Sequence, residues 1–330
     1  MSKIRLTLAC DTYDRTAALA DGTVKPEGID LNYIHLPVEE TFWRMCQYHE
    51  FDISEMSFSS YMINLSRSDD FRAIPVFPSR VFRHDCIFIN ADSGIKKPQD
   101  LVGKRVGLPE YQLTAAMFQR GLLQHEYGVQ PTSINWLQGG LLEPGREERT
   151  EITYPKGISV QKIGPNQTLA QMLEAGEIDA LLTARTPPNF SPDGNGPIRR
   201  LFPDFKKVEQ DYYRNTRIFP IMHTVVLRKD VLDQYPWAAE SMFKAFRQSK
   251  AILDKRIDDA VSLRLMLPWL LADVEETRQV MGHDFWPYGL EANRPTLEAA
   301  TLYAYEQGLT PRKLAIEELF MPSTLHEFEI

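Results

Sequence analysis

The chain has 330 residues, of which 43% are hydrophobic and 25% charged, as is typical of a globular protein with two domains. Its 37 Lys and Arg residues and 45 Asp and Glu residues give a net charge of −8. This balance argues against nucleic acid and an acidic membrane as partners, because both require basic patches. An anionic ligand would have to be held by a few local arginines.

The cysteines and the lengths of the apolar runs indicate the cell compartment of the protein. Cys10, Cys46 and Cys86 have neither metal-ligand spacing nor a paired disulfide pattern, so we expect free thiols. The apolar run before Cys10 is too short for the core of an export signal, and no run of about 18 apolar residues could span a bilayer. These features predict a cytoplasmic protein that spans no membrane.

The first part of the chain alternates predicted strands with helices. Short β-rich runs indicate strands, and apolar residues at helical spacing indicate a helix opened by Pro37. The expected strands are residues 4–9, 30–36, 51–56 and 72–77, and the expected helix is 38–48. This alternation favours a parallel sheet covered by helices.

Residues 78–90, PSRVFRHDCIFIN, place Arg80, Arg83, His84 and Asp85 directly before an apolar strand-like run. A buried strand rarely begins beside unpaired charge. The segment therefore indicates an anion-binding mouth with a titratable histidine, and a solvated loop before a core strand is the alternative.

The strand and helix pattern restarts after this segment. The expected elements are a short helix and a strand within 98–107, a helix ending at 127, a strand at 135–137, an irregular insertion at 141–156, a helix at 169–176 and a strand at 178–183. Residues 217–228, RIFPIMHTVVLR, then repeat the arrangement of an arginine, a central His223 and a β-branched run.

The last hundred residues are predicted to be almost wholly helical. The expected helices are 237–256, 258–271, 275–281, 294–306 and 311–320. The whole pattern predicts a two-lobed α/β protein with a ligand cleft between its lobes. Residues 1–83 with 225–330 would form the first lobe, and 84–224 the second.

Several segments resemble known families. GKRVGLPEYQLTAAMFQRGLLQHEYGV and TLAQMLEAGEIDALLTA resemble the second lobe of type II periplasmic-binding-protein folds. RVFRHDCIFIN, FPIMHTVVLRKD, FWPYGLEANRPTLEAATLYAYEQGL and LFMPSTLHEFEI resemble the 4,5-dihydroxyphthalate decarboxylase family, and this resemblance covers essentially the whole chain. It implies a cytoplasmic carboxy-lyase that converts 4,5-dihydroxyphthalate to protocatechuate and CO2.

Such a reaction needs a general acid, a group that polarises the phenol and a clamp for the second carboxylate. Arg83 and Arg185 are the candidates for the clamp, because a guanidinium presents paired donors to a carboxylate. A structural pair between Arg185 and Asp179 is the alternative. His84 and His223 are the candidate catalytic residues, with His223 as proton donor and His84 as partner of the phenol or the carboxylate.

Further substrate-binding candidates follow the ends of predicted strands, where ligands of α/β proteins bind: Tyr13, Arg15, Ser57, Ser59, Tyr111 and Thr114. Ser57 and Ser59 could equally cap a helix. No cofactor is expected, since no nucleotide-binding or similar motif is present. A divalent metal held by the two histidines is the second hypothesis.

A second function is consistent with the same sequence. A non-catalytic solute-binding protein for an aromatic carboxylate would have the same fold and the same arginines. In both cases the expected partner is a small anionic aromatic molecule, and a homo-oligomer is left open.

Overall fold

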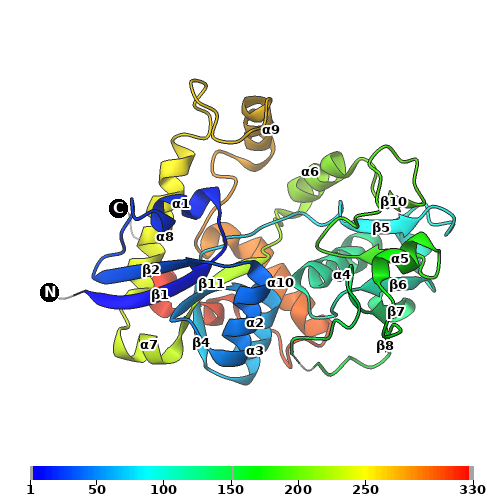
Figure 1. Ribbon diagram of the computed structural model, residues 1–330, viewed down its shortest axis with the longest axis horizontal. Coiled ribbons are helices and arrows are strands. Elements are labelled where there is room, and N and C mark those ends of the chain that lie inside the picture. The colour runs from blue at the N-terminus through cyan, green and yellow to red at the C-terminus, as the bar shows by residue number, and fades with distance from the viewer. Residues whose placement is uncertain (1–2, 151, 327–330) are drawn as a thin grey trace. The chain divides into compact units, whose positions relative to one another are not determined.

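The computed structural model describes residues 3–150 and 152–326, and the chain forms two compact units (Figure 1). Unit 1 contains the chain up to Arg80, Tyr213–Glu298 and the chain from Leu314 on. Unit 2 contains Val81–Tyr212 and Ala299–Lys313. Relative to the ranges expected from sequence, residues 213–224 lie in unit 1, and residues 81–83 and 299–313 lie in unit 2.

Unit 1 is built on a five-stranded sheet in the order β2-β1-β3-β11-β4. Its strands are β1 Ile4–Cys10, β2 Ile29–His35, β3 Ile53–Ser57, β4 Phe71–Ile74 and β11 His223–Arg228. β1 runs parallel to β2 and β3, whereas β11 is antiparallel to both β3 and β4. The four strands expected before residue 80 are confirmed. The late strand β11 lies between β3 and β4, and it carries His223 beside β3.

Unit 1 also contains helices and single helical turns, some of which contact this sheet. They are η1 Asp14–Thr16, α1 Ala17–Ala20, α2 Val38–Tyr48, α3 Phe58–Arg67, α7 Lys229–Gln234, α8 Ala238–Asp254, α9 Leu270–Met281, η4 Glu291–Asn293, η5 Ile316–Leu319 and η6 Pro322–Thr324. In α8, Ala238, Met242, Ala245 and Ser249 recur every three or four residues and are buried, as an amphipathic helix requires. The start of α8 follows the prediction closely.

Two of the expected C-terminal helices are wrong. The helix expected at 258–271 is an irregular segment, and α9 begins only at Leu270. Pro268 explains the difference, because proline lacks the N–H for a helical bond and clashes with the preceding turn. The helix expected at 311–320 is reduced to the single turn η5.

Unit 2 is built on a six-stranded sheet in the order β10-β5-β9-β6-β7-β8. Its strands are β5 Ile87–Asn90, β6 Arg105–Leu108, β7 Asn135–Gln138, β8 Val160–Lys162, β9 Ala180–Leu182 and β10 Ile198–Arg200. β6 is parallel to β7 and β9, and β7 is parallel to β8, whereas β5 is antiparallel to β9 and β10. Each unit is therefore a mixed α/β structure, which confirms the predicted class.

The helices of unit 2 are η2 Pro98–Leu101, α4 Thr114–Tyr127, η3 Pro131–Ser133, α5 Leu169–Glu174 and α6 Phe205–Thr216, together with most of α10 Arg294–Glu306. α10 approaches α4 closely because residue 121 is glycine. A Cβ there would lie 2.2 Å from Cδ2 of Tyr303. Gly128 ends α4 in the left-handed conformation, with φ of 70°. No helix within the described ranges has the length and apolar character needed to cross a membrane.

Candidate functional site

Unit 1 holds a buried hydrogen-bonded cluster of Glu55, His223, Tyr13, Asp11 and Cys10, which we call the Glu55 cluster. Strand register creates it. Glu55 of β3 pairs with Val225 and Ser57 pairs with His223, so Glu55 and His223 are diagonal neighbours on one face of the sheet. Diagonal neighbours are within reach of long side chains, and Nδ1 of His223 lies 2.6 Å from Oε1 of Glu55.

The loop after β1 completes the cluster. The Tyr13 hydroxyl donates to Oε1 of Glu55 at 2.6 Å, and the Asp11 backbone N–H donates to Oε2 at 3.0 Å. The Cys10 thiol lies 3.4 Å from Oε2. Both carboxylate oxygens therefore have partners, which a fully buried carboxylate needs.

These contacts set the protonation of Glu55. Burial alone would raise its pKa, but the charge of His223 and hydrogen bonds from His223, Tyr13 and Asp11 outweigh burial and hold the pKa below its ordinary value. Burial and the negative charge of Glu55 raise the pKa of Tyr13, so Tyr13 remains a phenol that donates. Glu55 is consequently an anion at neutral pH.

His223 is held on two sides but keeps an exposed edge. Its ring packs against Phe42 with the centroids 4.8 Å apart, and 17% of its side chain is exposed. Because Nδ1 faces an ionised carboxylate, Nδ1 carries a proton and Nε2 is the nitrogen that can exchange a proton with a ligand. This geometry fits a general acid.

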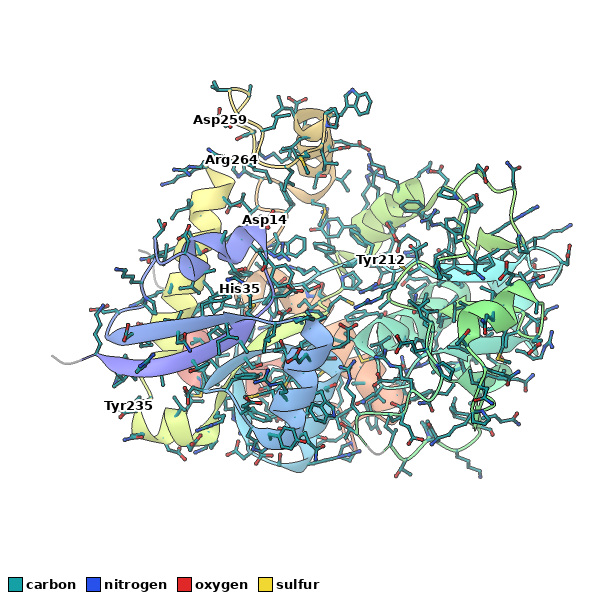
Figure 2. All side chains as sticks on the ribbon, viewed as in Figure 1. Asp14, His35, Tyr212, Tyr235, Asp259 and Arg264 are labelled. Carbon is teal, nitrogen blue, oxygen red and sulfur yellow. The ribbon has the colours of Figure 1, made fainter. Side chains whose placement is uncertain are left out.

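Arg15 lies beside the Glu55 cluster but already has partners. Its guanidinium stacks between the rings of Tyr13 and Trp286, 4.3 Å from each centroid. It donates to the carbonyl of Pro78 at 2.6 Å and pairs with Asp14 at 2.9 Å, on the loop labelled by Asp14 in Figure 2. Arg15 therefore orders the Tyr13 loop.

Ser57 and Ser59 are both buried where β3 meets α3, with their hydroxyl oxygens 3.4 Å apart. Ser57 occupies the position before α3 without a side-chain cap to the helix backbone. The helix-capping alternative is thus wrong for Ser57, and binding by these two serines stays a prediction.

In unit 2 the structure brings Arg83 next to the residue that precedes Arg185. Nη1 of Arg83 donates to the carbonyl of Ala184 at 3.2 Å. Arg83 is buried, whereas Arg185 is exposed beyond the end of β9. Asp179, the alternative partner of Arg185, is paired with Arg105 at 2.9 Å.

His84 is enclosed within unit 2. The ring centroids of Phe202 and Tyr212 each lie 5.1 Å from the centroid of the His84 ring. Burial lowers the pKa of His84 to about 4. Glu209 accepts from the backbone N–H of His84 at 3.1 Å and lies 3.9 Å from Nδ1. With its side chain 1% exposed, the ring has no surface to offer a substrate in this conformation, so the geometry favours a structural role.

The histidines thus belong to separate clusters, His84 in unit 2 and His223 in unit 1. Within residues 3–150 and 152–326, no group of three or more His, Cys, Asp and Glu side chains is arranged to hold a metal ion. The metal hypothesis stays untested by this arrangement.

Tyr111 and Thr114 are buried in the packing of unit 2. The Tyr111 hydroxyl donates to the carbonyl of Gln307 at 3.3 Å, and the Arg120 guanidinium lies 3.8 Å from the Tyr111 ring centroid. Thr114 is the first residue of α4. Their roles in binding catechol oxygens stay predictions.

Sequence reasoning missed Glu55. The signal was present, because Glu55 is a charged residue inside the short run ISEMS, which is otherwise compatible with a buried strand. A carboxylate in such a position must be paired or functional. Only the strand register identifies His223, 168 residues later, as its partner.

The comparisons with known proteins define the class first. A family model described as NMT1/THI5 like matches residues 81–143. The periplasmic aliphatic sulphonate binding protein SsuA from Escherichia coli aligns with a TM-score of 0.53 at 13% identity, covering 98% of this chain and 99% of that chain. The chain therefore has the α/β fold of periplasmic binding proteins, as its sequence predicts.

Curated relatives then define the family. The 4,5-dihydroxyphthalate decarboxylase of Comamonas testosteroni is 38% identical over 331 aligned residues, which cover 100% of both chains. That of Pseudomonas putida is 37% identical over 215 residues, covering 65% of this chain and 83% of the relative. The chain belongs to the 4,5-dihydroxyphthalate decarboxylase family.

Proposed function

We propose that this protein is a carboxy-lyase that removes one carboxylate from 4,5-dihydroxyphthalate, giving protocatechuate and CO2. Membership of the family over the full chain supports the reaction class. The observation that carries the assignment of the acid is the 2.6 Å contact between Nδ1 of His223 and the buried carboxylate of Glu55. This contact orients the imidazole of His223 as a proton donor.

The chemistry of the substrate defines what His223 does. The departing carboxylate is para to a phenolic oxygen, which can push electron density to the carbon that bears the carboxylate. Nε2 of His223 gives that carbon a proton, and a ring electron pair forms the new C–H bond. The C–C bond to the carboxylate then breaks, its electron pair restores the aromatic ring, and CO2 leaves. Glu55 holds the imidazole in the orientation for this transfer.

Arg83 and Arg185 are proposed to bind the carboxylate that remains. A guanidinium suits a carboxylate by its paired donors. The contact of Arg83 with the carbonyl of Ala184 supports this proposal, because it keeps the two residues in one neighbourhood of unit 2.

We also propose that turnover needs neither an organic cofactor nor a metal, since the ring, once protonated at the carbon that bears the carboxylate, accepts the electron pair of the breaking C–C bond. Addition of a chelator should leave turnover unchanged. Loss of activity on chelation, restored by a divalent ion, would instead support the metal hypothesis. We further propose a cytoplasmic location, consistent with three free cysteines, which cell fractionation would test.

Incubation of the purified protein with 4,5-dihydroxyphthalate tests the proposal. We expect equal amounts of CO2 and protocatechuate, with many turnovers per chain. The alternative, a non-catalytic binding protein for an aromatic carboxylate, would bind the substrate with a measurable heat and release no CO2.

A further inference from the structure

The side chain of Gln119 lies where the antiparallel pairing of β5 and β9 ends in unit 2. Ile87 of β5 and Leu182 of β9 are the last paired residues at this end of the two strands. Just beyond them, the Thr183 backbone N–H donates to the carbonyl of Cys86 at 3.3 Å. Gln119 belongs to α4, which contacts β9, and its side chain is buried.

The amide of Gln119 joins the two segments through their backbone carbonyls. Its Nε2 donates to the carbonyl of Cys86 at 2.9 Å and to the carbonyl of Thr183 at 3.0 Å. A primary amide has two N–H donors, so these two bonds use both of them. The carbonyl of Arg83 lies 3.5 Å from the same nitrogen, at the outer limit for a hydrogen bond. One side chain thus connects two segments that only the fold brings together.

The two segments joined by this amide carry the arginines of the proposed carboxylate clamp. Arg83 precedes Cys86 on one segment, and Arg185 follows Thr183 on the other. Nη1 of Arg83 donates to the carbonyl of Ala184 at 3.2 Å, and the Arg185 backbone N–H donates to Oγ1 of Thr183 at 3.2 Å. The amide therefore fixes backbone that lies directly beside both arginines.

Loss of the Gln119 donor would disturb this backbone. Cys86 and Thr183 are both buried, so their carbonyls depend on partners within the protein. A buried carbonyl that loses its donor either stays unsatisfied, at a cost in free energy, or turns toward another donor. Either change alters the backbone that holds Arg83 and Arg185.

Packing of the core does not by itself account for a glutamine at this position. Oε1 of Gln119 is buried and has no hydrogen-bond partner among the residues that the structure describes. Such an unpaired acceptor is unfavourable, and an apolar side chain of similar length would avoid it. The benefit of the glutamine therefore comes from its two donors, which hold the carbonyls beside the arginines.

We propose that Gln119 is a positioning residue for the carboxylate clamp, because its amide sets the spacing between the segments of Arg83 and Arg185. A guanidinium binds a carboxylate through a planar fork of donors, so affinity is sensitive to small shifts of the backbone. This inference rests on the proposed function, since it assigns Gln119 to the clamp of that reaction. Gln119 is buried, so it acts through the arginines.

Calorimetric binding of phthalate to the full-length protein tests the proposal without requiring turnover. Phthalate has both carboxylates of the substrate but lacks its hydroxyl groups. Gln119→Met keeps the length of the side chain and removes its donors, so the dissociation constant of phthalate should rise at least about tenfold. Gln124→Met is the matched control, since Gln124 is a half-buried glutamine of α4 that donates to Glu306 at 3.3 Å. It should bind phthalate as the wild type does.

A double-mutant cycle distinguishes positioning of the clamp from a general structural role. If Gln119 acts through the clamp, Gln119→Met in an Arg83→Ala chain should weaken phthalate binding by less than about threefold. A general loosening of unit 2 would weaken binding by the same factor in both chains. Thermal unfolding checks that each variant is folded. Gln119→Asn, which keeps the amide but shortens its reach, carries the same expectation if Gln119→Met does not fold.

Kinetics with 4,5-dihydroxyphthalate add a second readout, in which KM of Gln119→Met should rise while kcat stays within about twofold of the wild type. Wild-type affinity for phthalate in the Gln119 variants, or an equal loss in both chains of the cycle, would overturn the proposal. So would a wild type that does not bind phthalate, since the clamp itself would then be wrong. Release of CO2 by the wild type tests the proposed reaction separately from these outcomes.

Discussion

Glu55 accepts hydrogen bonds from His223, Tyr13 and the Asp11 backbone inside the core of unit 1. Each of these contacts favours the ionised carboxylate, and together they outweigh the cost of burial. A buried carboxylate hydrogen-bonded to an imidazole fixes the orientation of the ring. Glu55 is thus proposed to be the positioning residue for the proton donor.

Replacement of Glu55 by Gln tests this role. The amide would present a donor or a neutral acceptor to Nδ1, so the imidazolium would lose its ion pair. We expect kcat to fall by at least about tenfold with KM nearly unchanged, because Glu55 is fully buried and is proposed to act through His223. Steady-state kinetics at several pH values would measure kcat and KM of the variant and the wild type.

Glu50→Gln is the matched control, since Glu50 is an exposed partner of Arg44. It should behave as the wild type. A kcat of Glu55→Gln equal to that of this control would remove Glu55 from the mechanism.

The carboxylate clamp is tested by Arg83→Ala and Arg185→Ala. Loss of a charge-assisted contact should cost a few kcal/mol, so kcat/KM should fall on the order of a hundredfold. Arg185 is exposed, so its variant should fold normally, while circular dichroism should verify the fold of Arg83→Ala. Arg105→Ala, which removes the partner of Asp179, is the control. Wild-type kinetics for both clamp variants would show that neither arginine binds the carboxylate.

Residue types and their setting could identify part of the candidate site. His223 and Tyr13 follow from the sequence, because both border predicted strand ends, and the structure brings them to one carboxylate. Glu55 does not follow, since its partner depends on β11 pairing with β3 across 168 residues. His84 stands before a predicted strand in a setting similar to that of His223, which suggested a catalytic role. The rings of Phe202 and Tyr212 that enclose His84 do not favour that role.

Among the secondary-structure elements, α6 is linked to the segment before β5 by hydrogen bonds to the Glu209 side chain. This side chain accepts from the backbone N–H groups of His84 and Asp85 at 3.1 and 3.2 Å. Burial first, and then the negative charge of Asp85, raise the pKa of Glu209 to about 7 from 4.5, while burial lowers that of His84 to about 4 from 6.5. The two groups have opposite effects on stability as the pH changes.

The direction of each effect follows from where the protons are bound. Below about pH 6.5 the unfolded chain protonates His84 and the folded chain does not until about pH 4, so His84 lowers stability as the pH falls. The folded chain keeps a proton on Glu209 that the unfolded chain releases above about pH 4.5, so this contribution is lost as the pH rises toward about 7. Between about pH 4.5 and 6.5 the two slopes oppose each other.

Glu209→Gln should therefore reveal the effect of His84. Gln keeps an acceptor for both backbone N–H groups but has no titration. Relative to the wild type, the unfolding free energy of the variant should rise more steeply from pH 4.5 to 6.5, by about 1.4 kcal/mol per pH unit. Urea unfolding at several pH values measures this. Parallel pH profiles of variant and wild type would contradict it, and the exposed Glu147→Gln should give such a parallel profile.

Element prediction succeeded where local patterns are strong. The helix Val38–Tyr48 and the strands before residue 80 follow from periodicity, and Gly128 marks the end of α4. α6 could not be predicted in this way, because the residues it buries are the polar Glu209 and Tyr212. β8 and β10 have three residues each, too few for a period-two pattern.

At the scale of the whole molecule, the fold does not decide between binding and catalysis. A sulphonate binding protein shares it with a chain whose family is named for decarboxylation. The division into two units was predicted from the restart of the strand and helix pattern near residue 90. Their bounds depend on where residues 213–224 and 299–313 pack, which sequence does not reveal.

His223 is proposed to deliver the proton to the carbon that loses CO2. Single-turnover kinetics of His223→Gln test this role most directly. Gln preserves a hydrogen-bonding side chain but cannot act as an acid near neutral pH. We expect the rate of CO2 release to fall by about 10²–10⁴-fold while the dissociation constant of the substrate changes little. A variant that releases CO2 at the wild-type rate would contradict it.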